Sequence, residues 1–84
     1  MSDKILKFQA TWCQPCKMLS KVIEGEDLGV PIEEVDIDEK REVAQSFGIR
    51  GVPTMIYTRG GSEVSRVSGM MTLGDVQKWI SSVK

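Results

Sequence analysis

The sequence contains no histidine and only two cysteines among its 84 residues. Without histidine, catalysis by an imidazole base is excluded. A structural zinc site normally needs four Cys or His ligands, and this chain can offer two. Further ligands would have to be carboxylates or come from a second copy of the chain, so we predict no metal site.

Long apolar runs and clusters of basic residues are also missing. The strongly apolar runs are too short to span a bilayer, and the first residues, MSDKILKF, lack the apolar stretch of a signal peptide. The 11 basic and 12 acidic residues are spread along the chain and leave a formal net charge of −1, which favours neither nucleic acid nor an anionic membrane as a partner. We therefore expect a cytoplasmic protein, in a compartment where stable structural disulfides are uncommon.

Strand and helix patterns alternate along the chain, whose length fits one domain over residues 1–84. Short apolar or alternating runs predict strands at 4–10, 32–38, 53–59 and 63–69. Apolar residues at helical spacing predict helices at 17–24, 39–48 and 72–84. The order β-α-β-α-β-β-α predicts an α/β fold, in which a parallel βαβ unit and an antiparallel hairpin form a four-stranded mixed sheet with helices on both faces.

Both cysteines lie in the segment TWCQPCK, residues 11–17. Pro15 suits the first turn of a helix, so the first helix should begin between the cysteines. Cys13 would then have backbone N–H groups and the helix dipole directed at its sulfur, which favour the thiolate nucleophile of disulfide exchange. Cys16, one turn further along the same face, could resolve the mixed disulfide. The alternative is a pair of buried cysteines that act only as small apolar side chains.

The motif WCQPCK resembles the active-site motif of the thioredoxin family, in which WCGPCK is usual. GIRGVPT, residues 48–54, resembles the second thioredoxin signature and follows at the matching distance. The resemblance runs from about Ile5 to the C-terminus. It implies a minimal thioredoxin fold and an enzyme that reduces protein disulfides through Cys13 and Cys16 without a cofactor. It also implies that Pro53 is a cis-proline, beside which an extended substrate segment can pair.

The resemblance extends to the residues around the cysteines. Gly69 and Gly74 fall where thioredoxins have glycine, and Met70 follows in a loop that faces Cys13, where a methionine would adapt to several partners. Gln14 replaces the usual glycine and either tunes the reduction potential or points to solvent. The predicted substrate-binding residues are Trp12, Gln14, Pro15, Val52, Pro53, Gly69 and Met70. Trp12, Val52 and Met70 could equally be ordinary packing residues.

Two charges are exchanged relative to thioredoxins, which have a buried aspartate six residues before the first cysteine and a lysine paired with it on the neighbouring strand. The matching residues here are Lys7 and Glu34. Our hypothesis is that they form a partly buried pair beneath Cys16, that Glu34 receives the Cys16 proton through water, and that both residues, with Lys17, tune the pKa values of the cysteines. In the alternative, Lys7 extends to the surface while Glu34 and Lys17 are solvated.

The sequence is compatible with two classes of electron donor. Thioredoxins begin with an additional strand and helix, whereas these residues match the smaller core of glutaredoxins and of compact thioredoxin-like proteins from archaea and phages. We expect a monomer that acts on disulfide-containing proteins, with a thioredoxin-reductase-like donor. Glutathione is the alternative donor, although glutaredoxins usually have CPYC and a Gly-Gly-Asp segment before the last helix. A binding subunit with a thioredoxin fold and incidental redox activity is the remaining alternative.

Overall fold

The computed structural model describes residues 2–84, which form four strands and three helices. In chain order these are β1 Asp3–Gln9, α1 Gln14–Ile23, β2 Ile32–Asp36, α2 Arg41–Ser46, β3 Thr54–Arg59, β4 Ser62–Ser68 and α3 Leu73–Val83. The predicted order of elements is confirmed.

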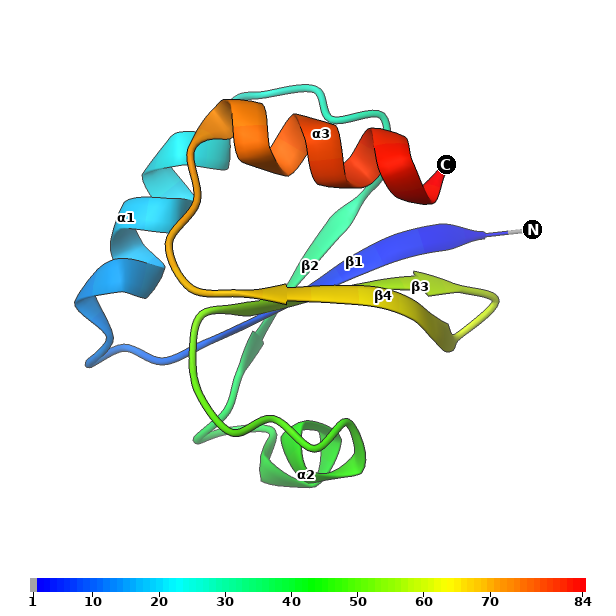
Figure 1. Cartoon of the computed structure of the whole chain (residues 1–84). Coiled ribbons are helices and arrows are strands. Elements are labelled where there is room, and N and C mark those ends of the chain that lie inside the picture. The colour runs from blue at the N-terminus through cyan, green and yellow to red at the C-terminus, as the bar shows by residue number, and fades with distance from the viewer. Residues whose placement is uncertain (1) are drawn as a thin grey trace.

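The strands form one mixed sheet in the order β2-β1-β3-β4. β1 and β2 are parallel, whereas β3 runs antiparallel to both β1 and β4. Helices α1 and α3 lie on one face of the sheet and α2 lies on the other (Figure 1). This is the α/β thioredoxin fold that the sequence predicted.

Each face of the sheet has its own apolar core. Neighbouring residues of β1 point to opposite faces, so that Ile5 packs beneath α1 and α3 while Leu6 packs toward α2. The first core contains Ile5, Leu19, Met55, Tyr57, Val76, Trp79 and Ile80. The second contains Leu6, Phe8, Val35, Ala44 and Ile56. Because β1 and β3 are covered on both faces, consecutive residues of each strand are buried, including Lys7 of β1 and Thr54 and Thr58 of β3.

The structure shortens two neighbouring predicted elements where they meet. The strand predicted at 32–38 ends at Asp36, and the helix predicted at 39–48 spans only Arg41–Ser46. The Asp36 carboxylate accepts the backbone N–H groups of Asp38 and Glu39, at 2.8 and 3.3 Å. This side-chain turn competes with both strand and helix and separates the two elements.

Candidate active site

Cys13 and Cys16 form a disulfide at the N-terminus of α1, with their Cα atoms 5.3 Å apart. Cys13 is the N-cap residue, and its Sγ accepts the backbone N–H of Cys16 at 3.2 Å. Pro15 occupies the first turn of the helix, as predicted. The same N–H and the helix dipole point at the Cys13 sulfur, where they would stabilise a thiolate after reduction.

Both cysteines are nearly inaccessible and contact the loop that precedes β3. They pack with Ala10, Ile37 and Val52. The Cys13 Sγ lies 3.6 Å from the Val52 carbonyl oxygen. A disulfide sulfur carries no hydrogen, so this is a contact that can become an S–H···O hydrogen bond only in the thiol form.

The segment Val52–Pro53 is joined to the loop after β4. The peptide bond between the two residues is cis. The Pro53 carbonyl accepts the backbone N–H of Gly69 at 2.8 Å. Gly69 has φ of 90°, a conformation that favours glycine over residues with a Cβ. The two loops are therefore fixed to one another beside the disulfide.

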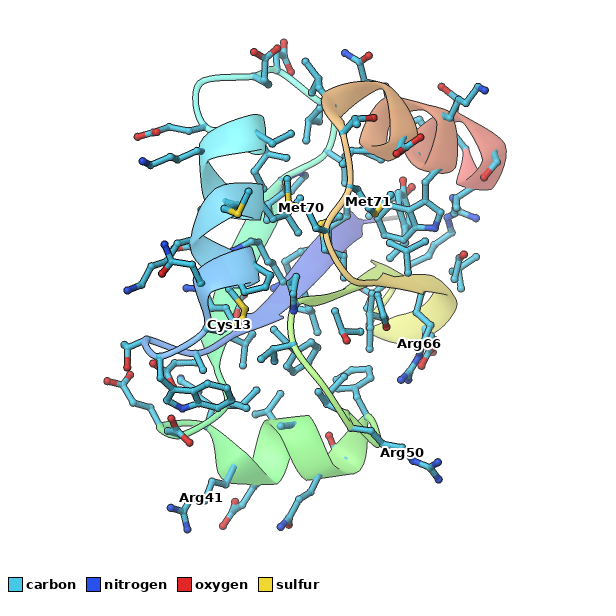
Figure 2. The ribbon with its side chains drawn as sticks, turned by 60° about the vertical axis from the view of Figure 1, so that its left-hand side comes forward. Cys13, Arg41, Arg50, Arg66, Met70 and Met71 are labelled. Carbon is cyan, nitrogen blue, oxygen red and sulfur yellow. A yellow bond between two sulfur atoms is a disulfide. The ribbon has the colours of Figure 1, made fainter. Side chains whose placement is uncertain are left out.

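Several predicted substrate-binding residues are exposed. Trp12 keeps 67% of its surface accessible, and its indole N–H donates to the Asp38 carboxylate at 2.9 Å. Met70, on the loop between β4 and α3, is 43% exposed (Figure 2). Gln14, Pro15 and Lys17 are exposed as well. Asp38 could not be selected from the sequence, because an acidic residue after a strand is ordinary.

Lys7 is fully buried, and its ammonium group makes three polar contacts. Its Nζ donates to the side-chain oxygens of Gln9 and Ser20, the latter at 2.7 Å, and lies 3.7 Å from a carboxylate oxygen of Glu34. The Glu34 side chain is 58% exposed. Burial lowers the pKa of Lys7, while the Glu34 charge acts in the opposite direction. Lys7 therefore does not extend to the surface, as the alternative expected, whereas Glu34 and Lys17 are exposed, as it expected.

A small hollow lies beside Cys16, and both residues that accept hydrogen bonds from Lys7 line it. The side chains of Gln9, Ser20, Lys17 and Asp36 are among its lining. Glu34 instead lines a separate hollow between α1 and β2. The carboxylate that shares a hollow with Cys16 is therefore that of Asp36.

The contacts of Lys7 determine which polar atoms of Gln9 and Ser20 remain free to donate a hydrogen bond. Lys7 occupies an acceptor oxygen of both Gln9 and Ser20, which leaves the amide N–H groups and the hydroxyl O–H as donors. Sequence periodicity could have placed each residue on the right face of its element, but not the contact of Ser20 with Lys7. Gln9 is two residues after Lys7 on the same strand, and Ser20 is four residues after Cys16 on the same helix.

Residues 2–84 contain no group of three or more Cys, Asp or Glu side chains arranged to hold a metal ion. None of the helices in this part of the chain has the length and apolarity needed to span a bilayer. The groups available for chemistry at the helix start are two sulfurs, backbone N–H donors and a polar hollow. This set suits thiol–disulfide exchange.

Comparison with known proteins gives one consistent family. The family model described as Thioredoxin matches residues 1–82. Thioredoxin H2-1 of rice, Oryza sativa subsp. japonica, is 40% identical over 68 residues, which are 77% of this chain and 49% of the relative. A thioredoxin of Chlamydia muridarum is 38% identical over 80 residues, covering 92% of this chain and 78% of the relative.

Among solved structures, a variant thioredoxin from Halobacterium salinarum superposes with a TM-score of 0.89 at 32% identity. The match covers 98% of this chain and 74% of that one. The chain thus spans about half the length of the rice relative and about three quarters of the other two.

Proposed function

This chain belongs to the thioredoxin family, and from that premise we propose that it is a thiol–disulfide oxidoreductase that reduces disulfides in proteins. The observation that carries the proposal is the Cys13–Cys16 disulfide at the N-terminus of α1, with the N–H of Cys16 directed at the Cys13 sulfur. We propose that residues 1–84 act as one monomeric domain. The presence of a single sheet with an apolar core on each face supports this proposal.

The proposed reaction transfers two electrons from the cysteine pair to a substrate disulfide. The Cys13 thiolate attacks one substrate sulfur, a mixed disulfide forms, and the second substrate sulfur leaves as a thiolate that takes up a proton. The Cys16 thiolate then attacks the Cys13 sulfur, which re-forms the Cys13–Cys16 bond and releases the first substrate sulfur. A dithiol donor must return two electrons and two protons to the pair.

The substrate is proposed to bind as an extended segment beside Val52, Pro53 and Gly69. The hydrogen bond from the Gly69 N–H to the Pro53 carbonyl supports this assignment, because it joins two loops beside Cys13. Trp12 and Met70 would add apolar contact area, which their exposure supports. Gln14 and Pro15 are proposed to border the same surface at the exposed start of α1.

We assign to Lys7 the stabilisation of the Cys16 thiolate through Gln9 and Ser20. The hydrogen bonds from its ammonium group to both side chains, and the position of both in the lining of the Cys16 hollow, support this role. Asp36, which lines the same hollow, is the better candidate than Glu34 to receive the Cys16 proton. Glu34 is proposed to act only on Lys7, by partly balancing its charge. Lys17 is proposed to add a weaker positive charge from the exposed surface of α1.

The proposed donor is a thioredoxin-reductase-like protein, because the relatives and structures matched above are thioredoxins. No cofactor is proposed beyond the redox-active disulfide. We propose a cytoplasmic location, because a disulfide that must be reduced after each turnover needs a reducing compartment. Cell fractionation would test the location.

The test of function is reduction of a protein disulfide by a dithiol donor, with and without the protein. We expect the wild-type protein to accelerate the reaction and the double variant Cys13→Ser, Cys16→Ser to give only the uncatalysed rate. Ser81→Ala, an exposed change at the far end of α3, is the matched control and should keep full activity. Equal rates for the wild-type protein and the double variant would overturn the proposal.

A further inference from the structure

Two hollows border the loop of residues 51–53, which packs against the disulfide. The first contains apolar side chains that include Trp12 and Val52, together with Arg41 and Arg50. The second lies between the same loop and β4, and is lined by Pro53, Arg50 and Arg66 among others. Their volumes of about 450 and 410 Å³ are sufficient for side chains of a bound segment.

The two hollows differ in charge from the chain as a whole. Each is lined by two arginines and by no aspartate or glutamate, and Arg50 belongs to both. The hollow between α1 and β2, away from this loop, is lined by Glu24, Glu26 and Glu34 with a single lysine. The formal net charge is −1. The positive charge of these two hollows therefore reflects where the charged residues lie, and not an excess of basic residues in the chain.

Two of the three guanidinium groups are available to a partner. Arg66 already pairs with Glu63 at 2.6 Å and donates to the Phe47 carbonyl. Within residues 2–84, no ion pair and no side-chain hydrogen bond involves Arg41 or Arg50, and both residues are exposed. Figure 2 shows both side chains extending away from the body of the molecule, Arg41 from α2 and Arg50 from the loop before β3.

We propose that this surface selects substrate segments in which acidic residues flank the reactive cysteine, with their carboxylates on Arg50 and Arg41. The inference rests on the proposed function, because it concerns the substrate of the same cysteine pair. Arginine offers a carboxylate two parallel N–H donors, which gives orientation as well as attraction. An extended segment that places its cysteine at Cys13 would carry its neighbouring side chains toward the two hollows.

The expected preference is modest and depends on salt. Exposed ion pairs change binding only slightly, so each arginine should contribute about two- to fivefold in rate. Attraction between opposite charges also speeds encounter, and this effect weakens as ionic strength rises. A preference of this size is compatible with reduction of many proteins.

The experiment uses the reduced wild-type protein and three disulfide-linked peptide dimers. The peptides are identical except that glutamate, glutamine or lysine stands on both sides of the cysteine. The second-order rate constant is measured for each peptide and divided by that peptide's rate constant with dithiothreitol, a dithiol whose only charge is that of its reacting thiolate. The division removes differences in the intrinsic reactivity of the peptides.

We expect the normalised rate constants to fall from glutamate to glutamine to lysine, by about two- to fivefold at each step at low salt. The glutamate-to-glutamine ratio should fall toward one in Arg50→Gln, further in the double variant Arg41→Gln, Arg50→Gln, and at high salt in the wild-type protein. Lys78→Gln removes the same charge from the exposed face of α3 and should keep the wild-type ratio.

Equal normalised rate constants for the three peptides would overturn the charge preference alone. A glutamate-to-glutamine ratio that keeps its wild-type value in the double arginine variant would also overturn the proposal, because the preference would then not come from Arg41 and Arg50. Failure to reduce any of the peptides would overturn the proposed function and this inference with it.

Discussion

The two sulfurs of one disulfide have different surroundings. Cys13 lies at the helix N-cap against the Val52 carbonyl, next to hollows lined by apolar side chains and arginines. Cys16 adjoins a small polar hollow, behind which the buried ammonium group of Lys7 is held by Gln9 and Ser20. The outer side is suited to contact a partner protein, and the inner side is suited to stabilise charge on sulfur. In the proposed roles, partner selection and redox tuning therefore depend on different residues.

The largest expected effect separates the roles of the two cysteines. Cys13→Ser and Cys16→Ser should both abolish turnover, because each removes one partner of the disulfide. Only Cys16→Ser should accumulate a mixed disulfide with substrate, since it retains the attacking sulfur and lacks the resolving one. Mass spectrometry under non-reducing conditions detects the adduct, and its accumulation with Cys13→Ser instead would reverse the assignment.

The next effect concerns the inner side. Lys7→Met keeps the apolar stem and removes the charge, so the Cys16 thiolate loses stabilisation and the disulfide becomes harder to reduce. We expect the reduction potential to fall by about 20 to 40 mV, which corresponds to roughly 1 to 2 kcal/mol for two electrons. The potential is measured by equilibration with glutathione or dithiothreitol buffers.

Lys4→Met is the matched control for that measurement. Lys4 is on the same strand, but its ammonium group is exposed and pairs with Glu33 at the surface. Its replacement should leave the potential at the wild-type value. Identical potentials for Lys4→Met and Lys7→Met would remove Lys7 from the redox machinery.

A smaller effect is expected on the outer side. Asp38→Ala removes the acceptor of the Trp12 indole N–H and should allow the exposed ring to turn away from the substrate surface. We expect kcat/KM for a protein disulfide to fall by about two- to fivefold, the usual range for one exposed hydrogen bond to a charged group. Glu39→Ala, at the next position, should match the wild-type protein. If both variants behaved alike, the Trp12–Asp38 bond would have no part in substrate binding.

The smallest effect on the reduction potential of the disulfide is expected from a change at Asp3, at the opposite end of β1, which should alter the stability of the fold instead. Asp3 accepts hydrogen bonds from Arg59 and Tyr57, which lower its pKa from 3.8 to about 2. A carboxylate with a lowered pKa stabilises the fold fully above its ordinary pKa, and this contribution is lost as the pH falls through the lowered value. The stability difference between the wild-type protein and Asp3→Asn should therefore be complete above about pH 5, should be mostly lost at about pH 2 and should vanish only below it.

Urea unfolding over a series of pH values measures this difference. Glu26→Gln, a change at an exposed loop carboxylate, is the control and should show no such dependence. The reduction potential of Asp3→Asn should equal that of the wild-type protein. A changed potential would mean that the two ends of β1 are coupled.

Local patterns were sufficient to predict the order of elements and the start of α1 between the cysteines. Apolar periodicity and Pro15 specify those features within a few residues of themselves. The partners of Lys7 could not be predicted in full, because Ser20 reaches it only after α1 has packed on the sheet. The arginine-lined hollows were also missed, since Arg41, Arg50 and Arg66 come from three different segments and show no cluster along the chain.

The most direct single measurement is the equilibrium reduction potential of the wild-type Cys13–Cys16 pair. A protein that passes electrons to protein disulfides should have a potential below the glutaredoxin range, which begins at about −230 mV. We predict a value between about −270 and −230 mV, with the stabilising effect of Lys7 on the reduced form included. A value of about −230 mV or higher would contradict the proposed reductase and would point to glutathione coupling or to oxidase or isomerase activity.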